Sequence, residues 1–117
     1  MSNCPLCYSF CDQTVTIYRR KAGKTERIVE EKAYLQKKEV LHTDALGSVK
    51  KQEFLLVLPG DTQKVFPGDW IMEGIGPEIP DEVSLQPGIM KGLGQVKETQ
   101  RFYWENTICH TEAKGES

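Results

Sequence analysis

Four cysteines are the residues of this chain whose spacing could support metal chemistry. Cys4 and Cys7 enclose two residues, and this CxxC spacing allows two thiolates to bind one zinc ion. Cys11 would supply a third ligand, and Cys109 or His110 a fourth. The candidate ligands for a structural zinc ion are therefore Cys4, Cys7, Cys11 and Cys109.

The alternative is that these cysteines are reduced and bind no metal. A zinc ribbon contains two CxxC pairs, whereas this chain has one. Cys109 and His110 are adjacent, so on a strand they would point to opposite sides and only one could join a site. The segment at residues 1–10 has no basic region and no long apolar stretch, so we expect no export and no disulfide. In this alternative the protein has no cofactor.

Catalytic patterns are weak in this sequence. The two histidines, His42 and His110, lie in no nucleophile or metalloprotease motif. The acidic pairs at 30–31 and 81–82 are adjacent, and neighbouring side chains diverge on a strand. The glycines at 88–94 are not followed by the lysine and hydroxyl residue of a phosphate-binding loop. We therefore expect a protein that is not an enzyme.

Charge is distributed unevenly along the chain. The 117 residues are 38% hydrophobic and 27% charged, which fits one soluble domain, and no apolar run is long enough for a membrane span. Residues 19–51 carry ten basic and five acidic side chains, whereas residues 52–90 carry one basic and seven acidic side chains. Opposed charge blocks suit head-to-tail packing of identical subunits, although two solvated faces would give the same pattern.

A basic turn offers a second functional hypothesis. Arg19, Arg20, Lys21 and Lys24 surround a hairpin turn beside Tyr18. Basic and aromatic residues together on a small barrel can bind single-stranded nucleic acid, although such a cluster is more often solvated. The aromatic run at 102–104 is expected to form an inward face with edge residues.

The elements that would position these residues are mainly strands. Residues 14–20 alternate β-branched, aromatic and polar side chains and predict a first strand, followed by a turn at 21–24. Residues 26–41 have a helix-forming composition, but strands on both sides favour one long strand, or two separated by a bend. Residues 42–51 predict a loop. Apolar residues at 54–58 and alternation at 70–73 predict two more strands, each next to a Pro-Gly-Asp turn.

The rest of the chain combines a long loop with a closing hairpin. Residues 74–94 hold five glycines and three prolines, and a loop of this length is usually functional or mobile. Its apolar side chains predict a contact with the domain or with a neighbouring subunit; they are Ile75, Ile79, Val83, Leu85, Ile89 and Met90. Residues 95–105 and 107–110 predict the final hairpin, with Asn106 in its turn.

These elements predict an all-β fold, a small antiparallel β-barrel or sandwich of about six strands with one long Gly/Pro-rich loop. We expect a cysteine-containing N-terminal arm at 1–13, a single β-barrel domain at 14–110 with the protruding loop 74–94, and a flexible C-terminal tail at 111–117.

The order of these motifs resembles small head-to-tail connector proteins of tailed bacteriophages, which are often described as minor capsid proteins. The matching residues are Thr16–Tyr18, Tyr34–Gln36, Val57–Pro59 and Pro67–Ile71. The resemblance covers about residues 14–110, and each motif is short.

The resemblance implies a structural virion protein, a neck subunit of the stopper (head-closure) or adaptor kind. Such proteins are small β-barrels that assemble as homo-oligomeric rings between the portal and the tail. The implied partners are the adjacent neck proteins on the portal or adaptor side and on the tail-terminator side. Packaged DNA would pass through the channel without sequence-specific binding, and an acidic lumen would repel its phosphates. The implied location is the head-to-tail interface of the virion, after synthesis in the bacterial cytoplasm, with no membrane contact. Loop 74–94 would be the partner contact.

Overall fold

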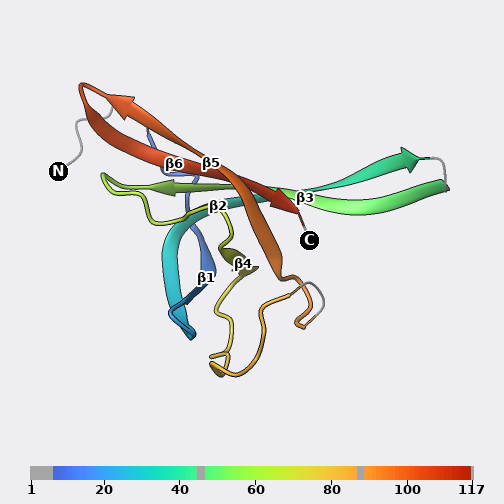
Figure 1. The fold of residues 1–117 in the computed structure, drawn as a ribbon. Helices are drawn as coiled ribbons and strands as arrows, with labels where there is room; N and C mark the ends of the chain where they lie inside the picture. Colours follow the sequence, from blue (N-terminus) through green and yellow to red (C-terminus); the bar gives the residue numbers. More distant parts are fainter. Residues whose placement is uncertain (1–6, 45–46, 87–88, 117) are drawn as a thin grey trace.

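The protein is a closed six-stranded antiparallel β-barrel, as the sequence predicts (Figure 1). The computed structural model describes residues 7–44, 47–86 and 89–116. The strands are β1 (Gln13–Lys21), β2 (Lys24–Asp44), β3 (Gly47–Pro59), β4 (Trp70–Glu73), β5 (Gly94–Trp104) and β6 (Thr107–Glu116). They follow one another around the barrel in the order β1, β2, β3, β6, β5, β4. Within the described residues, no helix is long and apolar enough to cross a membrane.

The barrel interior is filled by apolar side chains from every strand. Its largest fully buried members include Ile17 from β1 and Leu56 and Leu58 from β3. β1 is buried on both faces, because Val15 and Ile17 point into the barrel while Thr16 and Tyr18 lie under the long loop. The same division holds in β4, where Ile71 joins the interior and Trp70 joins the outer cluster. The alternation at 70–73 is therefore confirmed.

Two tight hairpin turns are also confirmed. β1 and β2 are joined at Ala22 and Gly23, which have φ values of 52° and 78°. β5 and β6 are joined at Glu105 and Asn106, with φ values of 49° and 68°. Positive φ at both central residues twists a two-residue turn in the sense that antiparallel strands require.

Residues 26–41 form one long strand, within β2, and the predicted loop at 42–51 is wrong. β2 continues to Asp44 and pairs with β3 from Gly47 onward, in unbroken register from Tyr34↔Val57 to Asp44↔Gly47. Residues 45 and 46 lie outside the described residues. Residue types such as Thr43 and Ser48 are common in turns and therefore predicted a loop. The hydrogen bonds between strands join backbone groups, however, so any residue that tolerates an extended backbone can form them.

The predicted flexible tail at 111–117 is also wrong for residues 111–116. These residues form the second half of β6, between β3 and β5. Ala113 is fully buried in the core, and Gly115 allows β6 to pass close to Gln95 and Phe54. In the sequence, the small and polar residues of this segment are typical of a flexible tail. In the barrel, Ala113 and Gly115 occupy positions where a larger side chain would not fit.

Candidate functional site

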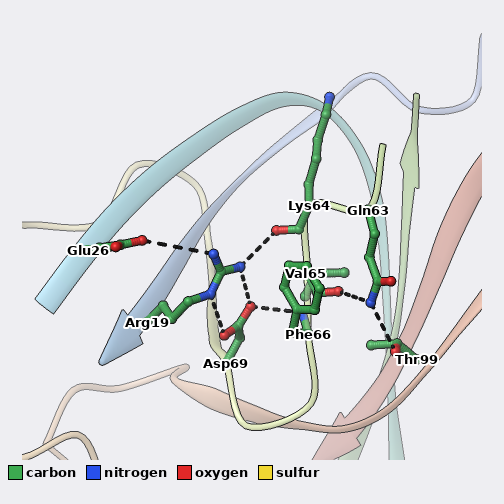
Figure 2. A network of polar contacts seen from close by, with 8 residues as sticks. All are labelled: Arg19, Glu26, Gln63, Lys64, Val65, Phe66, Asp69 and Thr99. Carbon is green, nitrogen blue, oxygen red and sulfur yellow. Dashed lines mark hydrogen bonds and ion pairs between the residues drawn. The ribbon is translucent and has the colours of Figure 1, made fainter. Parts of the chain in front are cut away.

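A polar network centred on Arg19 fixes the second Pro-Gly-Asp turn against β1 (Figure 2). The Arg19 guanidinium donates to both oxygens of Asp69, with Nε–Oδ1 at 2.9 Å and Nη2–Oδ2 at 2.8 Å. Nη2 also donates to the Lys64 carbonyl at 3.1 Å. Asp69 Oδ2 accepts from the Phe66 amide at 2.9 Å, and Asp69 is 3% exposed. The carboxylate therefore holds its own turn and anchors that turn to the first strand.

The exposed side of this network is covered by Phe66. The Arg19 guanidinium carbon lies 4.8 Å from the centre of the Phe66 ring, close enough for a cation–π contact. Hydrogen bonds to Asp69 are the main reason that the pKa of Arg19 is raised above its ordinary value. Arg19 is therefore a permanently charged structural residue. Sequence analysis missed this pair, because only Asp69's place in a turn was considered.

The predicted basic turn is divided between structural and exposed residues. Arg19 is engaged as above, and Arg20 donates to the backbone carbonyls of Asp81 and Val83. Lys21 and Lys24 are exposed. The two arginines therefore attach turn and loop segments to the β1–β2 hairpin, and the two lysines remain at the surface.

The long loop packs on the outer face of β1. Thr16 Oγ1 donates to the Gly74 carbonyl at 2.7 Å and accepts from the Gly76 amide at 2.8 Å. The fully buried Tyr18 hydroxyl donates to the Pro77 carbonyl at 2.7 Å. A Cβ at Gly76 would lie 2.1 Å from the Tyr18 hydroxyl oxygen, so the loop approaches this closely only with glycine there.

The loop's apolar residues separate into two groups. Four of the six predicted contact residues pack against Tyr18, Trp70 and Leu93; they are Ile79, Leu85, Ile89 and Met90. Ile75 is 71% exposed and Val83 is 37% exposed. Burial of the first group is accounted for within the chain, which leaves Ile75 and Val83 as the apolar side chains that the loop presents outward.

Tyr18 gives the protein a predicted alkaline sensitivity. Burial raises the pKa of Tyr18 above 10.0, against the opposing effect of Arg27. The unfolded tyrosine loses its proton at about pH 10 and the folded one at higher pH, so the contribution of Tyr18 to stability is fully present below about pH 10 and is lost above it. We expect the urea-derived free energy of unfolding to decline above pH 10, and Tyr18→Phe to remove part of that decline. At pH 7, Tyr18→Phe should cost about 1 kcal/mol through the lost hydrogen bond, whereas Tyr103→Phe, at an exposed position, should cost nothing measurable.

Among the described residues, the predicted zinc ligands are not brought together into a metal-binding group. Cys109 is disulfide-bonded, which contradicts our expectation of reduced cysteines and removes its thiolate as a metal ligand. Cys7 is exposed and Cys11 is buried, and both are free thiols, while Cys4 lies outside the described residues. Over residues 7–44, 47–86 and 89–116, no group of three His, Cys, Asp or Glu side chains could hold a metal ion. β6 pairs with β3 and β5, so the first and last strands are not neighbours.

The N-terminal arm instead docks through aromatic and polar contacts. The Tyr8 hydroxyl lies 2.5 Å from His110 Nδ1, and His110 Nε2 lies 3.0 Å from Glu112 Oε2. The Phe102 ring stacks on His110 at 4.6 Å, and Phe10 packs edge-on against Tyr34 at 5.5 Å. His110 is thereby buried in a structural contact. The sequence holds no short-range signal for it, because Tyr8 and His110 are 102 residues apart.

The aromatic run at 102–104 lies at the end of the β5–β6 hairpin. Phe102 is partly buried against His110, but Tyr103 is 54% exposed and Trp104 is 46% exposed. Phe102 is therefore the more buried residue of the run, and Tyr103 and Trp104 are the edge residues. Tyr103 also has Arg101 over its ring at 5.8 Å. This exposed end is a candidate contact surface.

An open groove of about 620 Å³ runs over the outer face of β2, β3, β6 and β5. Three lysines and three glutamates line it: Lys38, Lys97, Lys114, Glu53, Glu98 and Glu116. A shallow groove with balanced charges suits a polar protein surface better than a ligand pocket, which is usually concave and mostly apolar.

The fold defines the class of this protein as a small closed antiparallel β-barrel with docked loops and projecting hairpins. No family profile, no curated protein and no solved structure matches the chain. The functional argument therefore depends on the barrel and its surfaces.

Proposed function

We propose that this protein is a head-to-tail connector (neck) subunit of a tailed bacteriophage, of the stopper (head-closure) kind, which assembles as a ring between the portal or adaptor and the tail. The observation that carries the proposal is the shape of the barrel. A two-stranded ribbon from β2 and β3 projects from one side and the β5–β6 hairpin from the other (Figure 1).

Ring subunits need two different surfaces that meet head to tail. Large apolar side chains are exposed on both projections, with Leu41 at 62% on the ribbon and Tyr103 and Trp104 on the hairpin. A ring would bury these side chains against a neighbouring copy. The opposed charge blocks at 19–51 and 52–90 support the same arrangement.

The proposal predicts assembly of the full chain. Sedimentation velocity of the purified protein, alone and mixed with the portal protein of the same phage, should detect a ring or a portal-bound complex. A strict monomer that joins neither ring nor portal contradicts the proposal. Portal and capsid genes upstream and tail genes downstream would support it independently.

The second candidate function is nucleic-acid binding. One observation favours it: Lys21 and Phe66 line the same shallow surface hollow, beside Arg20. A basic side chain next to an exposed ring suits a single-stranded nucleic acid. A salt-dependent shift of single-stranded DNA that is lost in Lys21→Gln/Lys24→Gln would favour this function over the connector role.

A further inference from the structure

The end of the β5–β6 hairpin is built as a contact surface that no residue of this chain covers among those described. We call this surface the aromatic end and define it by Tyr103 and Trp104, which are 54% and 46% exposed. The stacking of Phe102 on His110 joins β5 to β6 next to these two side chains. The exposed rings are therefore presented on a fixed support.

The β5 strand adds a backbone surface beside these rings. β5 pairs with β4 at Gln95 and Gly94, and Val96 exchanges backbone hydrogen bonds with Gly68 and Asp69. From Lys97 to Trp104, the ladder partner of β5 among the described residues is β6 alone. An edge strand of this length, with aromatic side chains, is a template for another strand, and isolated proteins usually block such edges. Strand addition is a common way of recruiting a partner.

A complementary surface lies on the opposite projection. We call the segments 37–44 and 47–52 the ribbon. β1 pairs with β2 only as far as Ala33, and β6 pairs with β3 only from Glu53, so the ribbon is two strands wide. It projects from the far side of the barrel (Figure 1), and Leu41 on it is 62% exposed.

The charges of the two projections are opposite. The ribbon segments contain four lysines against Glu39 and Asp44. The two strands of the hairpin, with the turn between them, contain four glutamates against Lys97, Arg101 and Lys114, which leaves a net charge of −1. Lysine ammonium groups also form cation–π contacts with aromatic rings. The ribbon is therefore complementary to the aromatic end both in charge and in the contacts that its lysines can form.

We propose that the aromatic end binds the ribbon of a second copy of this chain, with the ribbon lying along the β5 edge and Leu41 packed on Tyr103 and Trp104. This inference rests on the proposed ring function and names its contact. Because the two surfaces are different and lie on opposite sides of the barrel, each copy offers one of each, and the contact can repeat head to tail. The proposed ring requires that the rotation between neighbouring copies closes, since an open filament forms otherwise.

Two full-length variants separate the two surfaces. Tyr103→Ser/Trp104→Ser alters only the aromatic end, and Leu41→Asp alters only the ribbon. All three side chains are exposed, so neither variant should lose stability. Ile75→Asp is the matched control, because Ile75 is 71% exposed on a different part of the molecule.

Wild type and Ile75→Asp should assemble alike in sedimentation velocity over a concentration series. Each surface variant alone should need at least tenfold more protein for half-assembly. Mixed one to one, the two variants should form a heterodimer and stop there, because the mixture retains one intact aromatic end and one intact ribbon. Only a head-to-tail contact between two different surfaces predicts that this mixture forms heterodimers but no rings.

Other outcomes overturn the inference in distinguishable ways. Rings formed by both variants would exclude these surfaces and leave the connector function standing. Assembly lost only in Tyr103→Ser/Trp104→Ser, with Leu41→Asp unaffected, would mean that the aromatic end binds another aromatic end. A wild-type chain that assembles neither alone nor on a portal ring would overturn the connector function and this contact together.

Discussion

Gly115→Ala is expected to lower the free energy of unfolding by about 3 kcal/mol, near the upper end of ordinary overpacking costs. A Cβ at position 115 would lie 2.0 Å from the Gln95 carbonyl oxygen and 2.6 Å from Phe54 Cζ. Phe54 is buried in the core and the Gln95 carbonyl belongs to the β5 backbone, so neither can move without disturbing the barrel wall. The cost comes from packing, since position 115 is not among the glycines with positive φ.

Thermal and urea unfolding of Gly115→Ala, wild type and Lys114→Ala provide the measurement. Lys114 is the exposed neighbour on the same strand, so Lys114→Ala should stay within about 0.5 kcal/mol of wild type. The melting temperature of Gly115→Ala should fall by roughly 10 °C for a domain of this size. A neutral Gly115→Ala would mean that residues 111–116 are the frayed tail that the sequence predicts and not part of β6.

Strand positions were predictable where side chains alternate strongly. The first strand, the short strand at 70–73 and the turn at Asn106 follow from β-branched residues, apolar runs and turn chemistry, and the structure confirms them. These signals are local, because each depends on residues next to one another in the chain.

Strand lengths were not predictable, because they depend on partners distant in sequence. Ala113 and Gly115 have low strand propensity, but they fit between β3 and β5, where larger residues would not. The ribbon beyond Lys37 is held by pairing of β2 with β3 and has no alternating apolar face. Both errors therefore came from assigning a tail or loop to segments whose stability is tertiary.

The candidate site was only partly visible in the sequence for a similar reason. The sequence identified the four basic residues of the hairpin turn. It did not show that Arg19 would pair with Asp69, which is 50 residues away in the chain. Likewise, the sequence predicted that the apolar residues of loop 74–94 pack on something, but it did not identify Tyr18 as their partner. Residue types indicate what a side chain can do, while the pairing in space decides which of these roles is used.

Asp69→Ala is expected to lower the free energy of unfolding by about 3 kcal/mol, the lower end of the cost of breaking a buried ion pair. The Asp69 side chain is 4% exposed and that of Arg19 is 24% exposed, so the alanine variant leaves a partly buried guanidinium without its carboxylate. It also leaves the Phe66 amide without its acceptor, which loosens the turn that precedes β4.

A double-mutant cycle isolates the contribution of the pair from the packing of the arginine stem. Arg19→Met keeps the aliphatic stem and removes the charge, and the double variant Arg19→Met/Asp69→Ala should be about 2 kcal/mol more stable than the sum of the single effects implies. Glu26→Gln is the control, because Glu26 is half-exposed and 3.9 Å from Arg19, and such a contact contributes less than about 1 kcal/mol. Additive single effects, within about 0.5 kcal/mol, would mean that Arg19 and Asp69 do not pair in solution. The second Pro-Gly-Asp motif would then act as a turn alone, without the link to β1 that the structure assigns to its aspartate.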